Sequence, residues 1–269
     1  MREVVAPTFY VLSQPIAEGL SKLAAAGIRL VEVYGDDPEK HFDLMDAAQA
    51  KHLAAVVRDL GMQVHAIHCA FSRPSEDLWD ISQPDDAKRN EVIERRIKAV
   101  HMTSKLGARH IIVHPGIQQR SEDRLRNCRA SLIRLADAAK GLGIMIAVEN
   151  LPPGYLGGSV AEMKRILEGL DPEVVGFCLD TGHAMLGADS YTDYIRALGD
   201  RMIAIHWHGN DGKEDGHTFP CDGSRSWDDF VAALDEVGYD LPVTVEAVPP
   251  DGMSFEAAAR AVRAILGTR

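Results

Sequence analysis

Short apolar runs alternate along the chain with longer amphipathic stretches. The apolar runs are rich in Val, Ile and Ala, and they predict strands at residues 3–9, 29–35, 62–68, 109–114, 144–149, 174–180, 201–208 and 242–248. Between them, apolar positions recur at helical spacing, which predicts helices near residues 15–26, 43–60, 85–106, 121–142, 159–169, 190–199, 226–237 and 254–267. Glycines in AAGI, DLGM, KLGA, GLGI and EVGY stand just before strands, where a left-handed helix C-cap is expected.

This alternation of strands and helices within 269 residues predicts a (β/α)8 TIM barrel. The strands are nearly continuous apolar runs, as expected when both faces of a parallel sheet are buried. An open doubly wound sheet is the alternative, but polar residues follow too many strands for a single crevice. No linker or low-complexity tract interrupts the pattern, so we expect one domain over residues 1–269.

Most predicted strands end in a residue that can bind a metal ion. These residues are His68, His114, Glu149, Asp180, His208 and Glu246. The carboxyl ends of barrel strands converge on one mouth, so residues distant in sequence become neighbours there. A hydrogen bond could explain any one of them, but no Lys or Arg stands at the matching strand ends to pair with the buried carboxylates. The set therefore predicts a divalent metal ion.

Two further groups of residues are expected at the same mouth. His183 follows Asp180 by three positions in CLDTGHA, on a loop or helical turn. Asp215 and His217 form an Asp-x-His pair in the loop after the seventh strand, which can fold back over the mouth. His206 shares the strand face of His208 one layer deeper, where we expect a hydrogen bond in the barrel interior.

The mixed ligand set favours Zn or Mn, with Co and Mg as alternatives. Imidazole nitrogens suit Zn, Mn and Co, and carboxylate oxygens suit Mn and Mg.

Three residues are candidate substrate contacts. Glu32 points inward on the second strand, although a structural hydrogen bond explains it equally well. Trp79 can form a pocket wall or pack in the core, and Lys213 is the evident cation for a substrate phosphate.

The amino-acid composition and net charge indicate which class of binding partner to expect. The formal net charge is −11, which makes a nucleic-acid partner unexpected and favours a small-molecule carbohydrate substrate. The apolar runs are too short to cross a bilayer, and the first residues read as a strand, so neither a membrane span nor a signal peptide is expected. The four cysteines are widely separated, which fits a reducing cytoplasm. A homo-oligomer remains open.

The motifs IHCAFS, IIVHPG, AVENLP, CLDTGHA, HWHGNDGKEDGH and GYDLPVTVEAV span nearly the whole chain. In this order they resemble the xylose-isomerase-like TIM barrel superfamily of sugar phosphate isomerases and epimerases, which is related to the endonuclease-IV-type AP endonucleases. The resemblance implies that Glu149, Asp180, His208 and Glu246 hold one metal ion. It also implies that the two glutamates act as the acid/base pair and that His183 contacts a substrate oxygen.

Two departures from the family pattern bear on the reaction. Ketohexose 3-epimerases of the superfamily carry an Arg six residues after the metal-binding His, where this chain has Glu214. In PCDG, Cys221 replaces a Gly of a loop that follows the seventh strand. The first departure argues against a ketohexose substrate, and the second indicates only a changed loop.

Three hypotheses follow. The first is a metal-dependent isomerase or epimerase of a sugar, keto-sugar or polyol derivative that abstracts a proton next to a carbonyl and forms an enediolate. The second is a multinuclear zinc phosphodiesterase, similar to an AP endonuclease, in which His68, His114, Asp215 and His217 hold further metal ions. The third is a binding protein that has kept the fold without catalysis. Fold analogy alone does not decide among them.

Overall fold

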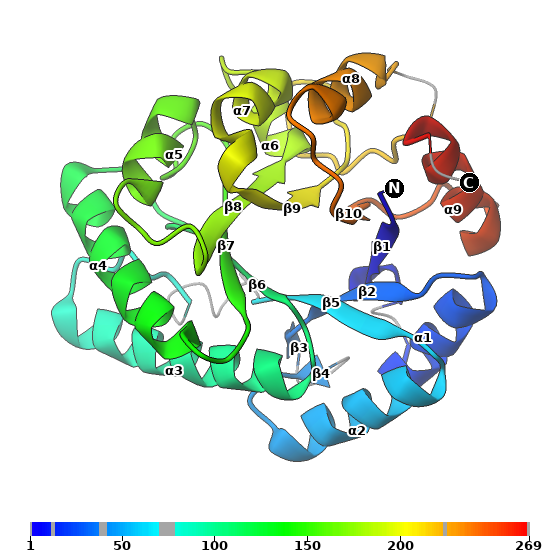
Figure 1. Ribbon diagram of the computed structural model, residues 1–269, viewed down its shortest axis with the longest axis horizontal. Coiled ribbons are helices and arrows are strands. Elements are labelled where there is room, and N and C mark those ends of the chain that lie inside the picture. Colours follow the sequence, from blue (N-terminus) through cyan, green and yellow to red (C-terminus); the bar gives the residue numbers. More distant parts are fainter. Residues whose placement is uncertain (1, 12–13, 38–41, 70–78, 223–224, 268–269) are drawn as a thin grey trace.

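The computed structural model describes residues 2–11, 14–37, 42–69, 79–222 and 225–267. Its parallel strands are β1 (Val4–Pro7), β2 (Leu30–Tyr34), β5 (Gln63–His68), β6 (His110–Val113), β7 (Met145–Glu149), β8 (Val175–Asp180), β9 (Met202–His206) and β10 (Val243–Thr244). They close into a barrel in the order β1-β10-β9-β8-β7-β6-β5-β2 (Figure 1). This arrangement confirms the predicted (β/α)8 TIM barrel.

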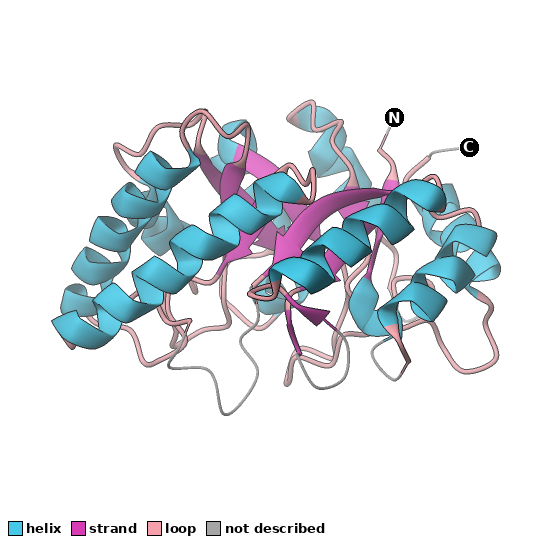
Figure 2. Cartoon of the chain, turned by 90° about the horizontal axis from the view of Figure 1, so that it is seen from below, coloured by secondary structure: helices cyan, strands magenta, loops and turns pink. Residues whose placement is uncertain are grey.

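Helices surround the strands on the outside of the barrel (Figures 1 and 2). They are α1 (Ile16–Ala25), α2 (Ala47–Asp59), α3 (Asp86–Lys105), α4 (Glu122–Ala139), α5 (Val160–Leu167), α6 (Thr181–Met185), α7 (Tyr191–Leu198), α8 (Asp228–Glu236) and α9 (Phe255–Ile265). The short elements are the 3-10 helices η1 (Thr8–Val11) and η3 (Gly199–Arg201) and an antiparallel pair, β3 (Asp36–Asp37) and β4 (Phe42–Asp43). Among the described residues, no helix combines the length and the apolar composition that a bilayer crossing requires.

Local sequence fixes the ends of these helices. Asp46 and Ser121 begin α2 and α4 by accepting hydrogen bonds from backbone N–H groups of the first turn. Five glycines that lie between a helix and the next strand adopt positive φ, namely Gly27, Gly61, Gly107, Gly143 and Gly238. All five positions were predicted from the sequence as left-handed caps.

The core has two layers, one inside the barrel and one between strands and helices. A small apolar cluster, most of it Ala and Cys, lies in the interior and consists of Ala66, Ile112, Ala147, Cys178 and Ala204. The main apolar cluster, with Val, Ile, Leu, Phe and Trp side chains, packs outside the strands against the helices. Both strand faces are therefore buried. Only residues near the strand ends can present a polar side chain to a ligand at the barrel mouth.

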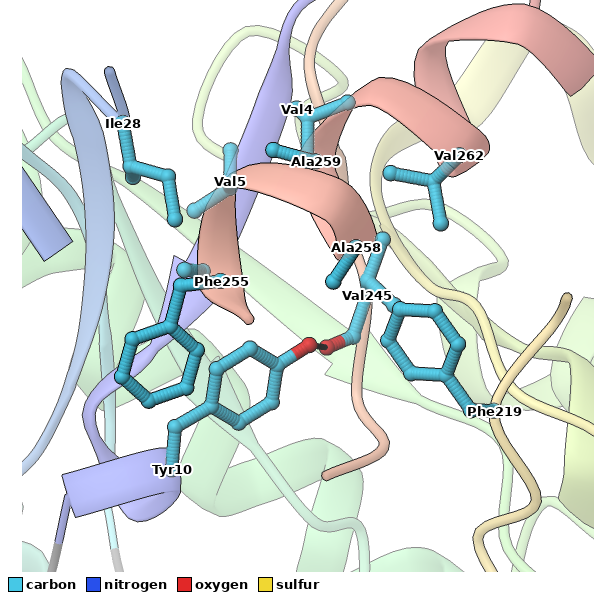
Figure 3. Close-up of a pocket in the computed structure, with 11 residues that line it drawn as sticks. Val4, Val5, Tyr10, Ile28, Phe219, Val245, Phe255, Ala258, Ala259 and Val262 are labelled. Atoms are coloured by element: carbon cyan, nitrogen blue, oxygen red, sulfur yellow. Dashed lines mark hydrogen bonds between the residues drawn. The ribbon is translucent and has the colours of Figure 1, made fainter. Parts of the chain in front are cut away.

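An apolar pocket lies where α9 packs beside β1 and the segment after β10 (Figure 3). Val4, Phe219, Phe255 and Ala258 are among its lining residues. The Tyr10 hydroxyl, which also lines it, donates to the backbone oxygen of Val245 at 2.5 Å. The pocket therefore offers an apolar wall, and its one hydroxyl is already bonded to the chain.

All eight barrel strands are shorter than the sequence predicts, and β9 and β10 stop well before their predicted ends. β9 ends at His206 rather than at residue 208, and β10 covers only Val243 and Thr244 of the predicted 242–248. Beyond these ends the backbones keep single hydrogen bonds, such as that from Glu246 N to Trp207 O at 3.1 Å, without a continuous ladder. His208 and Glu246 therefore stand on irregular backbone just past the barrel.

Candidate metal centre

Four side chains converge at the carboxyl ends of neighbouring strands. Glu149, Asp180 and His206 are the last residues of β7, β8 and β9, and Glu246 follows β10 by two positions. Each offers one ligand atom to a group whose atoms all lie within 4.8 Å of one another. All four residues are at most 2% exposed. The group has the size and the donors of a site for one divalent cation.

Strand register accounts for this convergence. Asp180 pairs with His206 across β8 and β9, and Thr244 of β10 pairs with the same histidine from the other side. Asn150 fixes the neighbouring strand ends, because its side chain accepts from Asp180 N at 2.8 Å and donates to Asp180 O at 3.0 Å. The parallel barrel thus brings these distant residues to one layer.

Imidazoles surround the carboxylate of Glu149. Its Oε1 lies 3.0 Å from His206 Nδ1 and 3.7 Å from His183 Nδ1. Its Oε2 lies 3.1 Å from His114 Nε2 and 3.4 Å from His68 Nε2. In the part of the chain that the structure describes, every ion-pair contact of Glu149 is to a histidine. The predicted residues His68 and His114 thus lie beside Glu149.

The second glutamate has a different set of partners. Oε2 of Glu246 lies 2.9 Å from His206 Nδ1, and its Oε1 accepts a hydrogen bond of 2.8 Å from the Tyr34 hydroxyl. Burial would raise the pKa of both glutamates, but the His206 charge holds the pKa of Glu149 and of Glu246 below the usual value. Both carboxylates are therefore ionised and ready to bind a cation or accept a proton.

The two carboxylate oxygens of Asp180 have different partners, one on the backbone of α6 and one at the candidate site. Oδ1 accepts from the backbone N of His183 at 2.7 Å and so begins α6. Oδ2 lies 3.1 Å from His208 Nε2 and 3.5 Å from His183 Nδ1. Gly182 makes room for the His208 ring, because a Cβ on that glycine would lie 2.0 Å from His208 Cε1. The glycine of CLDTGHA is thus required by close packing.

The loop after β9 folds back over this layer, as predicted. Gly209 and Thr218 pair as an isolated antiparallel bridge, which makes the segment between them a hairpin. Asp215 Oδ2 lies 3.1 Å from His183 Nε2 and 3.2 Å from His217 Nε2. His217 adopts φ of +43°, a sparsely populated region for a residue other than glycine.

Contacts beyond the hairpin account for this conformation of His217. Its Nδ1 donates to the Glu246 backbone oxygen at 2.7 Å, and its ring stacks on His208 with centroids 4.0 Å apart. Burial opposes the charged imidazolium, but contact with Asp215 raises the pKa of His217 to about 9. For His183, burial likewise opposes charge, and Asp180 and Asp215 raise the pKa to about 10. Asp215 therefore links two charged histidines above the central group.

The structure brings both histidines of the seventh strand to the carboxylates. The resemblance implies His208 as a metal ligand, and its Nε2 lies 3.1 Å from Asp180 Oδ2 and groups with His217 and Glu246. For His206 we expected a hydrogen bond in the barrel interior, and its Nδ1 lies 3.0 Å from Glu149 Oε1, in a group with Glu149, Asp180 and Glu246. The role of His208 as a metal ligand stays a prediction.

The three candidate substrate contacts do not join the central group. Glu32 is 0% exposed and lies below His206, with 3.1 Å between Glu32 Oε1 and His206 Nε2. Trp79 is buried, and the guanidinium of Arg96 lies 4.8 Å from its ring centroid. Lys213 is exposed on the hairpin, where its backbone N bonds Asp211. Tyr34 was not singled out from the sequence, because its hydrogen bond to Glu246 joins segments that are distant in the chain.

Curated relatives match at moderate identity. The ketose 3-epimerase of Arthrobacter globiformis is 26% identical over 245 residues, which cover 87% of this chain and 78% of that protein. The probable endonuclease 4 of Thermoplasma acidophilum is 26% identical over 178 residues, covering 62% of this chain and 59% of that protein. The two relatives thus carry names from two different classes of reaction.

Solved structures match the whole fold. A D-tagatose 3-epimerase-like protein superposes with a TM-score of 0.83 at 19% identity, covering 98% of this chain and 97% of its own. The IolI protein with a bound zinc atom gives a TM-score of 0.78 at 18% identity, with 98% of both chains covered. The family model for the xylose isomerase-like TIM barrel matches residues 20–265. The chain therefore belongs to the xylose isomerase-like TIM barrel family.

Proposed function

We propose that this protein is a divalent-metal-dependent isomerase or epimerase that acts on a sugar, a keto-sugar or a polyol derivative. One observation carries the proposal. Two ionised, buried carboxylates, Glu149 and Glu246, converge with Asp180 and His206 at the mouth of a barrel. A cation between them would leave each glutamate an oxygen to exchange a proton with a substrate. The sugar epimerases among the relatives and structural neighbours support the same class of reaction.

The donors fit a divalent metal ion. The Oε2 atoms of Glu149 and Glu246 are buried and make no hydrogen bond to any described group. Buried carboxylates without such bonds are costly unless a positive charge compensates them. Carboxylate oxygens together with an imidazole nitrogen suit Zn or Mn, with Co and Mg as alternatives. The zinc in IolI supports the assignment of a metal to this layer.

A bound divalent cation would polarise a substrate carbonyl and thereby acidify the neighbouring C–H group. Glu149 and Glu246 stand on β7 and after β10, separated by two strands, and would remove and return the proton from different sides. His183 donates through Nδ1 to Asn150 O at 2.8 Å, which directs Nε2 toward Asp215 and the mouth. From there it would donate a hydrogen bond to a substrate oxygen.

Solvent deuterium exchange tests this chemistry directly. The metal-loaded protein should incorporate deuterium from D2O into at least one member of a panel of keto-sugars, with and without phosphate. Glu246→Gln should slow exchange roughly 10²–10⁴-fold, because it removes one base while keeping the shape of the side chain. The thermal unfolding temperature of the variant provides the folding control. If the wild-type protein exchanges with no member of a broad panel, the proposal is wrong.

The multinuclear hydrolase is the second candidate because the mouth holds more ligands than one ion requires. Additional sets of ligand atoms lie within 4.8 Å of one another in His68–His114–Glu149 and in His208–His217–Glu246. Against it, a net charge of −11 disfavours binding to a phosphate backbone. Metal analysis of the purified protein separates the two candidates. One ion per chain supports the isomerase, and three ions per chain support the hydrolase.

A further inference from the structure

Tyr34 contacts one of the two mouth glutamates from a distant strand. It is the last residue of β2, whereas Glu246 lies two positions beyond β10. In the barrel, β1 stands between these two strands. The Tyr34 hydroxyl donates a hydrogen bond of 2.8 Å to Oε1 of Glu246 past the end of β1. The proposed reaction uses Glu246 and assigns no role to Tyr34.

Three contacts hold Tyr34 in place. Its backbone N donates to the Thr8 hydroxyl at 3.0 Å. Its ring stacks on the His68 ring, with centroids 4.7 Å apart and planes inclined by 8°. The ring of Phe9 meets it edge to face, with centroids 5.5 Å apart. Because backbone and ring are both fixed, the hydroxyl has a defined direction within the folded chain.

Glu246 depends on such contacts, because it lies beyond the regular ladder of β10. Its backbone N donates to Trp207 O at 3.1 Å, and its backbone O accepts from His217 Nδ1 at 2.7 Å. The Tyr10 hydroxyl bonds the backbone oxygen of the preceding residue, Val245 (Figure 3). These bonds fix the backbone of Glu246. The direction of its carboxylate is left to side-chain partners.

The Tyr34 hydroxyl gives the two oxygens of Glu246 different surroundings. A carboxylate only accepts, so the hydroxyl is the donor to Oε1. Oε2 is buried, makes no hydrogen bond to any described group and lies 2.9 Å from His206 Nδ1. Oε1 is thus held at the side of β2, and Oε2 faces the other candidate ligands. Carboxylates that bind metal ions are commonly held by a hydrogen bond of this kind.

We propose that Tyr34 is a positioning residue that orients the carboxylate of Glu246 for the metal ion. By holding Oε1, the hydroxyl directs Oε2 toward the site of the cation. The inference rests on the metal centre of the proposed function and extends it, because affinity for the ion then depends on a residue of β2 that does not bind the ion itself.

Metal titration tests the proposal without any sugar. The full-length chain is stripped of metal with a chelator and titrated with Mn²⁺, and the dissociation constant is measured by competition with a fluorescent chelator. Tyr34→Phe removes the hydroxyl and keeps the ring that stacks on His68. It should weaken Mn²⁺ binding roughly 10–100-fold and keep the stoichiometry of the wild type.

Tyr191→Phe is the matched control. The Tyr191 hydroxyl also donates to a carboxylate, that of Asp229, at 2.9 Å, and Asp229 is not one of the candidate ligands. This variant loses the same kind of hydrogen bond and should bind Mn²⁺ as the wild type does. Thermal unfolding of the metal-free proteins shows whether both variants are folded.

Two results would overturn the role of Tyr34. One is wild-type affinity for Mn²⁺ in a folded Tyr34→Phe variant, and the other is equal weakening in Tyr34→Phe and Tyr191→Phe. If Tyr34→Phe does not fold, Thr8→Val, which removes the acceptor of the Tyr34 backbone N, is compared with Thr8→Ser, which keeps it. Equal affinities of these two variants then exclude the role.

The same measurements separate this inference from the proposed function. A wild-type protein that binds Mn²⁺ but exchanges no sugar proton refutes the isomerase and leaves the titration of Tyr34→Phe decisive. A wild-type protein that exchanges sugar protons, combined with unchanged affinity in Tyr34→Phe, refutes only the role of Tyr34. At saturating Mn²⁺, Tyr34→Phe should exchange with a lower kcat and an unchanged KM for the sugar, because Tyr34 acts through Glu246. A raised KM with unchanged kcat would instead make Tyr34 a substrate contact.

Discussion

His183 at the mouth of the barrel and His65 nearer the amino-terminal end of β5 are almost equally buried, with 9% and 6% exposure. Their charges differ nonetheless. Burial opposes charge at both, yet Asp180 and Asp215 raise the pKa of His183 to about 10, whereas burial lowers the pKa of His65 to about 4. His110, whose ring centroid lies 5.1 Å from that of His65, also has a lowered pKa, of about 3.

The difference shows what separates a neutral buried histidine from a charged one in this fold. At the mouth, four acidic residues, Glu149, Asp180, Asp215 and Glu246, contact imidazoles within ion-pair distance. Near the other end, His65 and His110 stay neutral as part of the packing. For His183 and His65, the neighbouring carboxylates and not burial alone therefore decide whether the imidazole is charged.

Removing one mouth carboxylate should have the largest effect. Glu149→Gln should slow deuterium exchange roughly 10²–10⁴-fold and weaken Mn²⁺ binding, because this carboxylate contacts four imidazoles. Exchange by mass spectrometry and metal titration measure the two effects. His110→Gln near the other end is the matched control and should leave exchange per bound ion unchanged. If His110→Gln slows exchange as much as Glu149→Gln does, the contrast between the two ends is wrong.

The neutral histidines should produce a pH dependence of stability. Unfolded His65 takes up a proton below about pH 6.5, whereas folded His65 does so only near pH 4, so the unfolded state binds more protons in this window. Stability should therefore fall as the pH drops, by roughly 2 kcal/mol for this residue between about pH 6.5 and about pH 5. Urea unfolding of the wild type and of His65→Gln measures the difference, and the variant should show the shallower slope. Equal slopes would mean that His65 is not held neutral.

The sequence predicts the fold almost completely, because strands and helices leave repeating patterns of apolar residues along the chain. Apolar runs and helical spacing place every barrel strand and its following helix, and the glycines before strands mark the helix ends. The site is predicted less completely. Parallel strand ends identify Glu149 and Asp180, but only the folded chain shows that both His206 and His208 contact carboxylates of the mouth. The contacts of Tyr34 and Glu32 depend on strands distant in sequence, so no local pattern indicates them.

A packing change at Gly182 should have a smaller effect. Gly182→Ala places a methyl group 2.0 Å from His208 Cε1, so the ring or the start of α6 must move. We expect a loss of about 1–3 kcal/mol in the free energy of unfolding. Gly187→Ala is the matched control, because its methyl group would meet only ordinary contacts of 3.5 Å or more. Equal stability of the two variants in urea unfolding would show that His208 is not tightly packed against α6.

Lys213 should have the smallest effect of all. The sequence analysis offered it as a cation for a substrate phosphate, and the structure leaves the residue exposed on the hairpin. Lys213→Ala should change the free energy of unfolding by no more than about 0.5 kcal/mol. Exchange rates over a range of sugar concentrations then decide its role. An unchanged KM for phosphorylated and unphosphorylated sugars assigns recognition to the mouth, whereas a rise confined to the phosphorylated sugar would make the hairpin a phosphate contact.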